Sequence, residues 1–114
     1  MQDSPVVFKR IYLVKQSTGF DSISRALEKA EEDTIQFLLQ KLNVKPLNYP
    51  IEAEIRFLSK EKLELILIID LILSPLSPVV SRKSEIIEKI ADTFFNSFEK
   101  ALSYVKHHEK KHIK

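Results

Sequence analysis

Cysteine is absent from this chain of 114 residues, and glycine occurs only once, at Gly19. Without cysteine the protein can form no disulfide, no thiolate zinc site, no iron–sulfur cluster and no cysteine nucleophile. Glycine-rich phosphate loops need several glycines at fixed spacing, because the backbone must come close to the phosphate. The composition therefore excludes several common kinds of enzyme site, and we expect no bound cofactor.

Long apolar runs are also missing. The most apolar stretch, residues 63–73, contains Glu64 and Asp70 and is far shorter than the roughly 20 residues that a membrane-spanning helix needs. The first residues lack the basic stretch followed by an apolar region that marks a signal peptide. We therefore expect a cytoplasmic protein that does not contact a membrane.

The composition suits one globular domain covering residues 1–114. Hydrophobic residues make up 44% of the chain and charged residues 30%, as in an ordinary soluble protein. The net charge of +2 is unevenly distributed, since residues 100–114 hold five bases and one acid, whereas residues 63–99 hold three bases and six acids. The C-terminal residues, about 106–114, therefore form a basic tail, which we expect to be helical.

The basic tail has two interpretations. Cations near the C-terminal end of a helix complement its dipole, and a solvated helix end is the more ordinary outcome. A short basic segment can also contact RNA phosphates. The lysines available for such a contact are Lys106, Lys110, Lys111 and Lys114.

Hydrophobic periodicity predicts the order β-α-β-β-α. Residues 6–15, 51–58 and 63–73 are predicted strands, and the short polar turn between the last two makes them a hairpin. Residues 22–42 and a segment ending near residue 108 carry apolar residues at helical spacing. Asp21 or Ser22 is the expected N-cap of the first helix, and Ser81 that of the second. We predict an α+β fold, a three-stranded antiparallel sheet with both helices packed on one face.

The other face of the predicted sheet is unusually apolar. In residues 63–73 the odd positions should face the helices, which leaves Ile66, Ile68 and Ile72 on a face that is normally polar. Exposed apolar patches of this kind mark interfaces, so we expect a partner chain there. The alternative is that another part of the same chain covers the patch. The first strand adds one of two sets to this face: Val7, Ile11 and Leu13, or Phe8, Tyr12 and Val14.

Phe94 and Phe98 lie on a broad apolar face of the last predicted helix. One interpretation makes them part of the interface. The other places them in a wide core stripe, and this is the more common arrangement.

Residues 108–112 read His-Glu-Lys-Lys-His, which matches the letters of the zinc-protease motif. That chemistry needs a third ligand and a cleft. Here the neighbours are lysines and no further ligand follows. We predict at most adventitious metal binding by His108 and His112, no dedicated metal site and no catalytic residues, so the protein is not expected to be an enzyme.

Three segments resemble the small Pcc-type subunit of KEOPS, the assembly that makes threonylcarbamoyl-adenosine on tRNA. They are Ile-Glu-Ala-Glu-Ile-Arg-Phe at 51–57, the apolar strand with its Ser-Pro end at 63–75, and residues 85–98 of the last helix. The pattern, over about residues 20–106, is similar to an archaeal family of Pcc-like, or Gon-like, accessory subunits. In Pcc proper the last helix tends to read Arg-x-x-x-Asn-Ser. Asn96 and Ser97 match, whereas Asp92 stands at the arginine position, which indicates a paralogue.

The resemblance implies a non-catalytic role. Such a protein would pair with the Pcc subunit through its sheet, limit Pcc self-dimerisation and lie close to the catalytic subunit of KEOPS, with only indirect or weak tRNA contact. Two alternatives remain open. The protein could be a small RNA-binding module that uses its basic tail, or a homodimeric structural protein.

Overall fold

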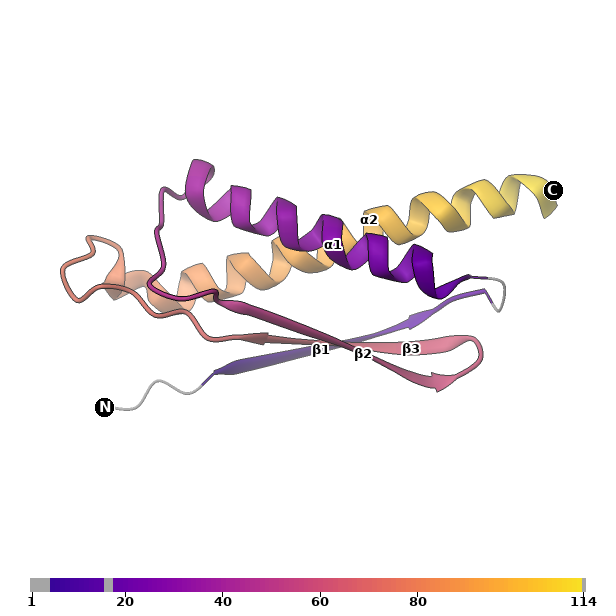
Figure 1. Ribbon diagram of the computed structural model, residues 1–114, viewed down its shortest axis with the longest axis horizontal. Helices are drawn as coiled ribbons and strands as arrows, with labels where there is room; N and C mark the ends of the chain where they lie inside the picture. Colours follow the sequence, from indigo (N-terminus) through magenta and orange to yellow (C-terminus); the bar gives the residue numbers. More distant parts are fainter. Residues whose placement is uncertain (1–4, 16–17, 114) are drawn as a thin grey trace.

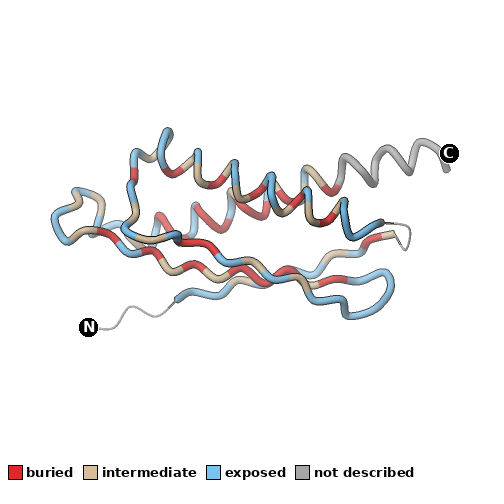
Figure 2. The backbone as a smooth tube through the Cα atoms, in the orientation of Figure 1, coloured by how far each residue is buried: buried red, intermediate tan, exposed pale blue. Residues whose placement is uncertain are grey.

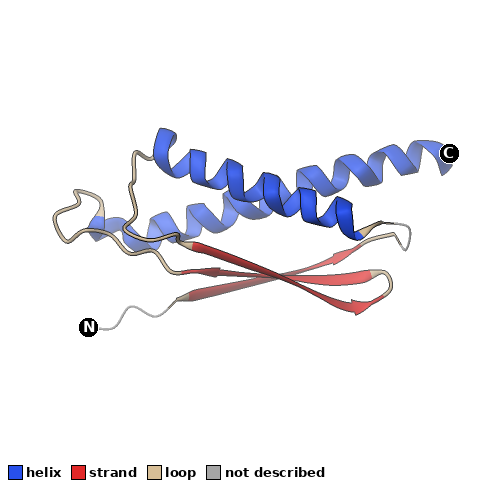
Figure 3. Cartoon of the chain, in the orientation of Figure 1, coloured by secondary structure: helices blue, strands red, loops and turns tan. Residues whose placement is uncertain are grey.

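A computed structural model describes residues 5–15 and 18–113, with side chains described as far as Leu102. The chain forms two layers, in which an antiparallel sheet carries both helices on one face (Figures 1 and 3). The predicted α+β class and its β-α-β-β-α order are therefore confirmed. The elements are β1 Val6–Leu13, α1 Phe20–Gln36, β2 Ile51–Ser59, β3 Lys62–Ile69 and α2 Lys83–Ile113.

β3 is the central strand, and the strand order is β1-β3-β2. The sequence could not reveal this order. Residue Ile69 of β3 pairs with Val6 of β1 on one side and with Ile51 of β2 on the other. The odd positions of β3 face the helices, as predicted, and they are completely buried: Leu63, Leu65, Leu67 and Ile69.

β3 ends earlier than the alternation of its side chains. The prediction of a strand to residue 73 is wrong because β1 and β2 both begin opposite Ile69, so no neighbouring strand is left to pair with. Burial nevertheless continues to alternate, with Leu71 and Leu73 buried and Ile72 exposed. The side-chain amide of Asn48 bridges the end of the ladder, donating to the carbonyl of Asp70 at 2.7 Å and accepting from the N–H of Ile72 at 3.2 Å.

The N-cap of α1 is Gly19, two or three residues before the predicted caps. The backbone N–H groups of Ser22 and Ile23 donate to the carbonyl of Gly19, which is in an extended conformation and makes no side-chain cap. Asp21 therefore lies inside the first turn, where its charge complements the helix dipole. The helix continues as a π-helical turn over Phe37–Lys41, which accounts for the predicted end near residue 42.

α2 begins after a 3-10 turn over Val80–Arg82. Ser81 lies within that turn, so its predicted role as N-cap is wrong. The helix extends to Ile113, some way past the predicted end near residue 108, and its backbone includes most of the basic tail.

The core fills the space between the two layers (Figure 2). Ala26 and Ala30 of α1 and Ile90 and Phe94 of α2 belong to the same buried cluster as the odd positions of β3, and all are nearly or fully buried. The face of the sheet opposite the helices has no second layer in the described part of the chain. That open face is where the candidate site lies.

Candidate functional site

The open face is the side of the sheet that the helices do not cover. Across β3 the register places Val7, Ile68 and Glu52 in one row, then Lys9, Ile66 and Glu54, then Ile11, Glu64 and Arg56. Within these rows the residues of β1 and β3 are mainly apolar, and the residues of β2 are all charged. One side of the open face, over β1 and part of β3, therefore has the character of an interface.

β1 supplies most of the exposed apolar surface. Val7 is 52% exposed, Ile11 56% and Leu13 66%. Phe8 and Tyr12 point the other way and pack against the core, the ring of Tyr12 lying 5.4 Å from that of Phe98. This settles the choice that the sequence left open, in favour of Val7, Ile11 and Leu13.

The predicted interface residues of β3 are less available than expected. Ile66 lies on the open face, yet it is only 6% exposed, because the side chains of Lys9 and Glu54 flank it on the neighbouring strands. Ile68 is partly exposed beside Val7. Ile72 is exposed but lies beyond the end of β3. Of the three, Ile68 is the one that a partner on the open face can reach within the sheet.

Phe94 and Phe98 are not part of any surface. Both are fully buried and belong to the core cluster between the layers. The prediction that they contribute to an interface is therefore wrong, and the core-stripe interpretation holds. Their rings are part of the broad apolar face that α2 turns toward the sheet.

β1 is also an edge strand, and its outward backbone groups can be identified. The N–H of Val14 donates to the carbonyl of Glu61 at 2.8 Å, so the even positions of β1 turn their backbone groups toward β3. Because backbone direction alternates in an antiparallel strand, Val7, Lys9 and Ile11 turn their N–H and C=O groups toward the outer edge. Exposed apolar side chains and a row of edge donors and acceptors therefore lie on the same strand.

The opposite edge, formed by β2, is protected. Every second residue along it is charged, namely Glu52, Glu54 and Arg56. The register shifts between Phe57 and Ser59, which indicates a bulge. Charges and bulges are the features that keep an edge strand from pairing with another chain. Only one edge of this sheet therefore resembles a pairing surface.

An ion pair on the helix side holds β1 against α2. Arg10 contacts the carboxylate of Glu99 at 2.5 Å, and its guanidinium carbon lies 4.5 Å from the ring centroid of Phe95. The hydroxyl of Tyr12 donates to the same carboxylate at 2.8 Å. Burial, followed by the hydrogen bond and the charge of Glu99, raises the pKa of Tyr12 far above its ordinary value. These contacts fix the edge strand without using its outer side.

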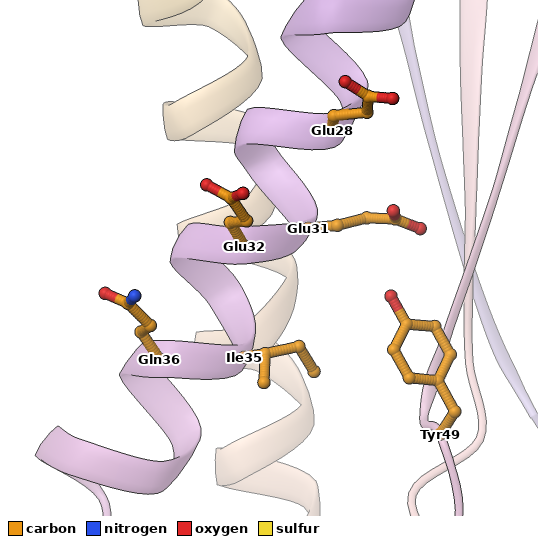
Figure 4. A pocket seen from close by; sticks show the side chains of 6 residues that line it. All are labelled: Glu28, Glu31, Glu32, Ile35, Gln36 and Tyr49. Atoms are coloured by element: carbon orange, nitrogen blue, oxygen red, sulfur yellow. The ribbon is translucent and has the colours of Figure 1, made fainter.

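A shallow hollow of about 600 Å³ lies beside α1 (Figure 4). Glu28, Glu31 and Glu32 line it, and the hydroxyl of Tyr49 points toward Glu31 from the far wall. Burial, together with the negative charge of Glu31, raises the pKa of Tyr49. Across the portion of the chain with described side chains, no group of three or more histidines, aspartates and glutamates is arranged to hold a metal ion. The hollow is thus an acidic surface, and among the described residues its carboxylates do not form a metal-binding group.

The basic tail lies outside the residues whose side chains are described. This applies to the predicted RNA contacts Lys106, Lys110, Lys111 and Lys114 and to the predicted adventitious metal ligands His108 and His112. A search of the described residues finds no helix with the length and apolar character needed to span a bilayer.

No protein-family model matches the chain, and comparisons with curated proteins and with solved structures find no match either. The geometry of the open face and of the β1 edge is therefore the observation that bears on function.

Proposed function

We propose that this protein is a non-catalytic subunit that pairs with a second protein chain through β1 and the adjoining part of the open face. The observation that carries the proposal is the composition of the β1 edge. Its outward N–H and C=O groups are joined by the exposed side chains of Val7 and Ile11. A long apolar edge strand is a template for another strand, and strand addition buries both the apolar and the hydrogen-bonding groups.

The charges of β1 favour a different chain over a second copy. Residues 5–15 contain three bases, Lys9, Arg10 and Lys15, and no acid. Two copies of β1 paired antiparallel about the middle of the strand would bring Lys9 or Arg10 opposite the same residue of the other copy. Like charges directly opposite each other destabilise a sheet. The fitting partner strand is apolar and carries acidic residues opposite Lys9.

The partner suggested by the resemblance is the Pcc subunit of KEOPS, the complex that installs threonylcarbamoyl-adenosine on tRNA. The β-α-β-β-α order and the segments between residues 51 and 98 support this assignment. In this role the protein would occupy the strand edge of Pcc that otherwise serves self-dimerisation. It would stabilise the assembly without taking part in the chemistry.

The test is a binding titration with a purified Pcc-type subunit, using a variant that removes a backbone N–H of the β1 edge and a second one that changes only the side chain at the same position. Lys9→Pro deletes an outward N–H and leaves the β1–β3 ladder intact, so pairing should weaken about tenfold. Lys9→Gln keeps that N–H and should have a smaller effect. Ala53→Pro is the matched control, because the bond from Asp70 to the Pro50 carbonyl shows that Ala53 also turns its N–H outward, on the β2 edge.

A side-chain variant tests the open face. Ile68→Asp places a charge beside Val7 and should abolish pairing, while circular dichroism of the monomer stays unchanged. Normal pairing by both Lys9→Pro and Ile68→Asp would refute the proposal. A mass of two copies for the protein alone would favour the homodimer instead. Salt-sensitive RNA binding that disappears when residues 106–114 are deleted would favour the RNA-binding module.

A further inference from the structure

The loops at one end of the molecule carry the largest group of exposed apolar side chains. This loop end comprises residues 37–50 and 70–84, which meet where α1 and β3 finish (Figure 1). Six of the large hydrophobic residues exposed among the described residues belong to it: Leu39, Leu47, Tyr49, Ile72, Leu76 and Val80. Leu76 is 92% exposed, more than any other of them. The fold itself gains nothing from an apolar residue at that position.

Leu76 lies on a loop that is ordered by hydrogen-bonded turns. Two consecutive turns each begin with a serine followed by a proline, and the N–H of Ser77 donates to the carbonyl of Ser74 at 2.9 Å. In each turn the serine hydroxyl accepts a backbone N–H two residues later, from Leu76 at 3.2 Å and from Val79 at 3.3 Å. Proline at the second position fixes the backbone for such turns. An exposed anchor that is already ordered loses little entropy when it binds.

The other loop, residues 37–50, is bonded to the loop of Leu76, the knob of this surface, and lines a hollow. The N–H of Leu47 donates to the carbonyl of Ile72 at 2.8 Å, which ties the two loops together. An apolar hollow of about 200 Å³ is lined by Leu39, Pro46, Tyr49 and Pro50. The loop end thus presents an exposed leucine and a concave apolar surface on two loops that are joined by a hydrogen bond.

The charge of the loop end identifies its partner by chemistry. Residues 37–49 and 70–84 contain four bases and one acid. Two copies meeting through this end would bring these bases together, so like charge disfavours self-association. A lipid surface does not select for a knob combined with a hollow, whereas a protein surface does. A single fitting occupant is an acidic protein surface that contains a leucine-sized apolar pocket.

We infer that the loop end is a second interface, separate from the β1 edge, through which the protein docks onto an acidic protein chain that accepts Leu76 in an apolar pocket. The inference rests on the proposed function in one respect, namely that this chain is a further subunit of the same assembly.

The experiment measures the affinity of this protein, alone and paired with Pcc, for each remaining KEOPS subunit, purified separately. Leu76→Ser should weaken binding to one subunit by about tenfold to a hundredfold, because a buried leucine side chain is lost. Pro75→Gly loosens the first turn and should weaken the same binding by about two- to fivefold. Leu58→Ser, which alters an exposed leucine at the opposite end, is the matched control and should change nothing.

Each result separates this inference from the proposed function. Normal Pcc pairing with no subunit sensitive to Leu76→Ser would overturn the inference alone. Failure of Pcc pairing would refute the proposed function, while the titrations of the unpaired protein would still test Leu76. Vesicles of phosphatidylcholine and phosphatidylserine provide the remaining arm. Binding to them that Leu76→Ser abolishes, without any protein partner, would identify a lipid surface and overturn the inference.

Discussion

At the residue scale, Glu99 connects β1 to α2 by accepting from both Arg10 and Tyr12. Both side chains of the ion pair between Arg10 and Glu99 are more than a third exposed, and pairs of this kind contribute little to stability. The hydroxyl of Tyr12 is half-buried and donates to the carboxylate of Glu99 at 2.8 Å. Tyr12 is therefore the member of this cluster whose ionisation state matters for the fold.

Tyr12 should make stability sensitive to alkaline pH. Its pKa is raised in the folded protein above the ordinary value of 10.0, first by burial and then by Glu99. The unfolded chain thus loses this proton first, so the stabilisation is complete below about pH 10 and is lost as pH rises above it. Tyr12→Phe should flatten the fall in the free energy of unfolding between about pH 9 and 11. Urea denaturation across this range measures it, and an unchanged slope would contradict the assignment.

The site residues show what single-residue reasoning can predict. Period-two alternation correctly placed Ile66 and Ile68 on the face opposite the helices. It could not predict that Ile66 is shielded, because its burial depends on Lys9 and Glu54, and these become neighbours only through the strand order. Phe94 was predicted to be an interface residue, yet it is fully buried. The apolar stripe of a helix does not show how much of its width the sheet covers.

At the element scale, α1 approaches its neighbours through small residues. Ala26, Ala30 and Thr34 recur every four residues and are almost completely buried. The hydroxyl of Thr34 donates to the carbonyl of Ala30 at 2.7 Å, which satisfies it inside the core. Across this contact, Ser97 of α2 donates to the carboxylate of Asp33 at 2.7 Å. Short side chains let the two helices pack closely together on one sheet.

Ala30→Leu should disrupt that packing. Ala30 is fully buried, so the added methylenes have no space, and overpacking typically costs about 1–3 kcal/mol. Gln36→Leu makes a similar side chain at an exposed position of the same helix and should change stability by less than about 0.5 kcal/mol. Chemical denaturation of both variants measures the difference. Equal stability would mean that α1 does not pack through this stripe.

The elements themselves were predictable where the pattern was long. The alternation of residues 51–58 and the helical stripe of α1 each survive in the structure within a few residues. Their ends were less predictable. β3 stops where its neighbouring strands stop, which leaves no mark on the local sequence. The N-cap of α1 is Gly19, which makes no side-chain hydrogen bond, whereas Asp21 and Ser22 carry the side chains that usually cap a helix.

At the scale of the whole molecule, the two edges of the sheet differ. β1 has exposed apolar side chains and outward backbone groups, whereas β2 has a charged residue at every second position from Glu52 to Arg56 and a bulge near its end. A sheet with two open edges can add chains without limit, but a sheet with one open edge adds only one. The asymmetry predicts a closed pair, in which this chain ends the growth of the sheet.

That closure should be visible as stoichiometry. With a Pcc-type subunit in increasing excess, the complex separated by size exclusion should have, by light scattering, the mass of one copy of each chain at every ratio. The triple variant Glu52→Thr, Glu54→Thr and Arg56→Thr removes the charges that protect β2 and gives it strand-forming residues. It should form larger species under the same conditions. These should disperse when Lys9→Pro is added to the triple variant, because that substitution blocks the β1 edge. A wild-type mass that keeps rising with excess partner would show that β2 also pairs, and that this chain extends the sheet.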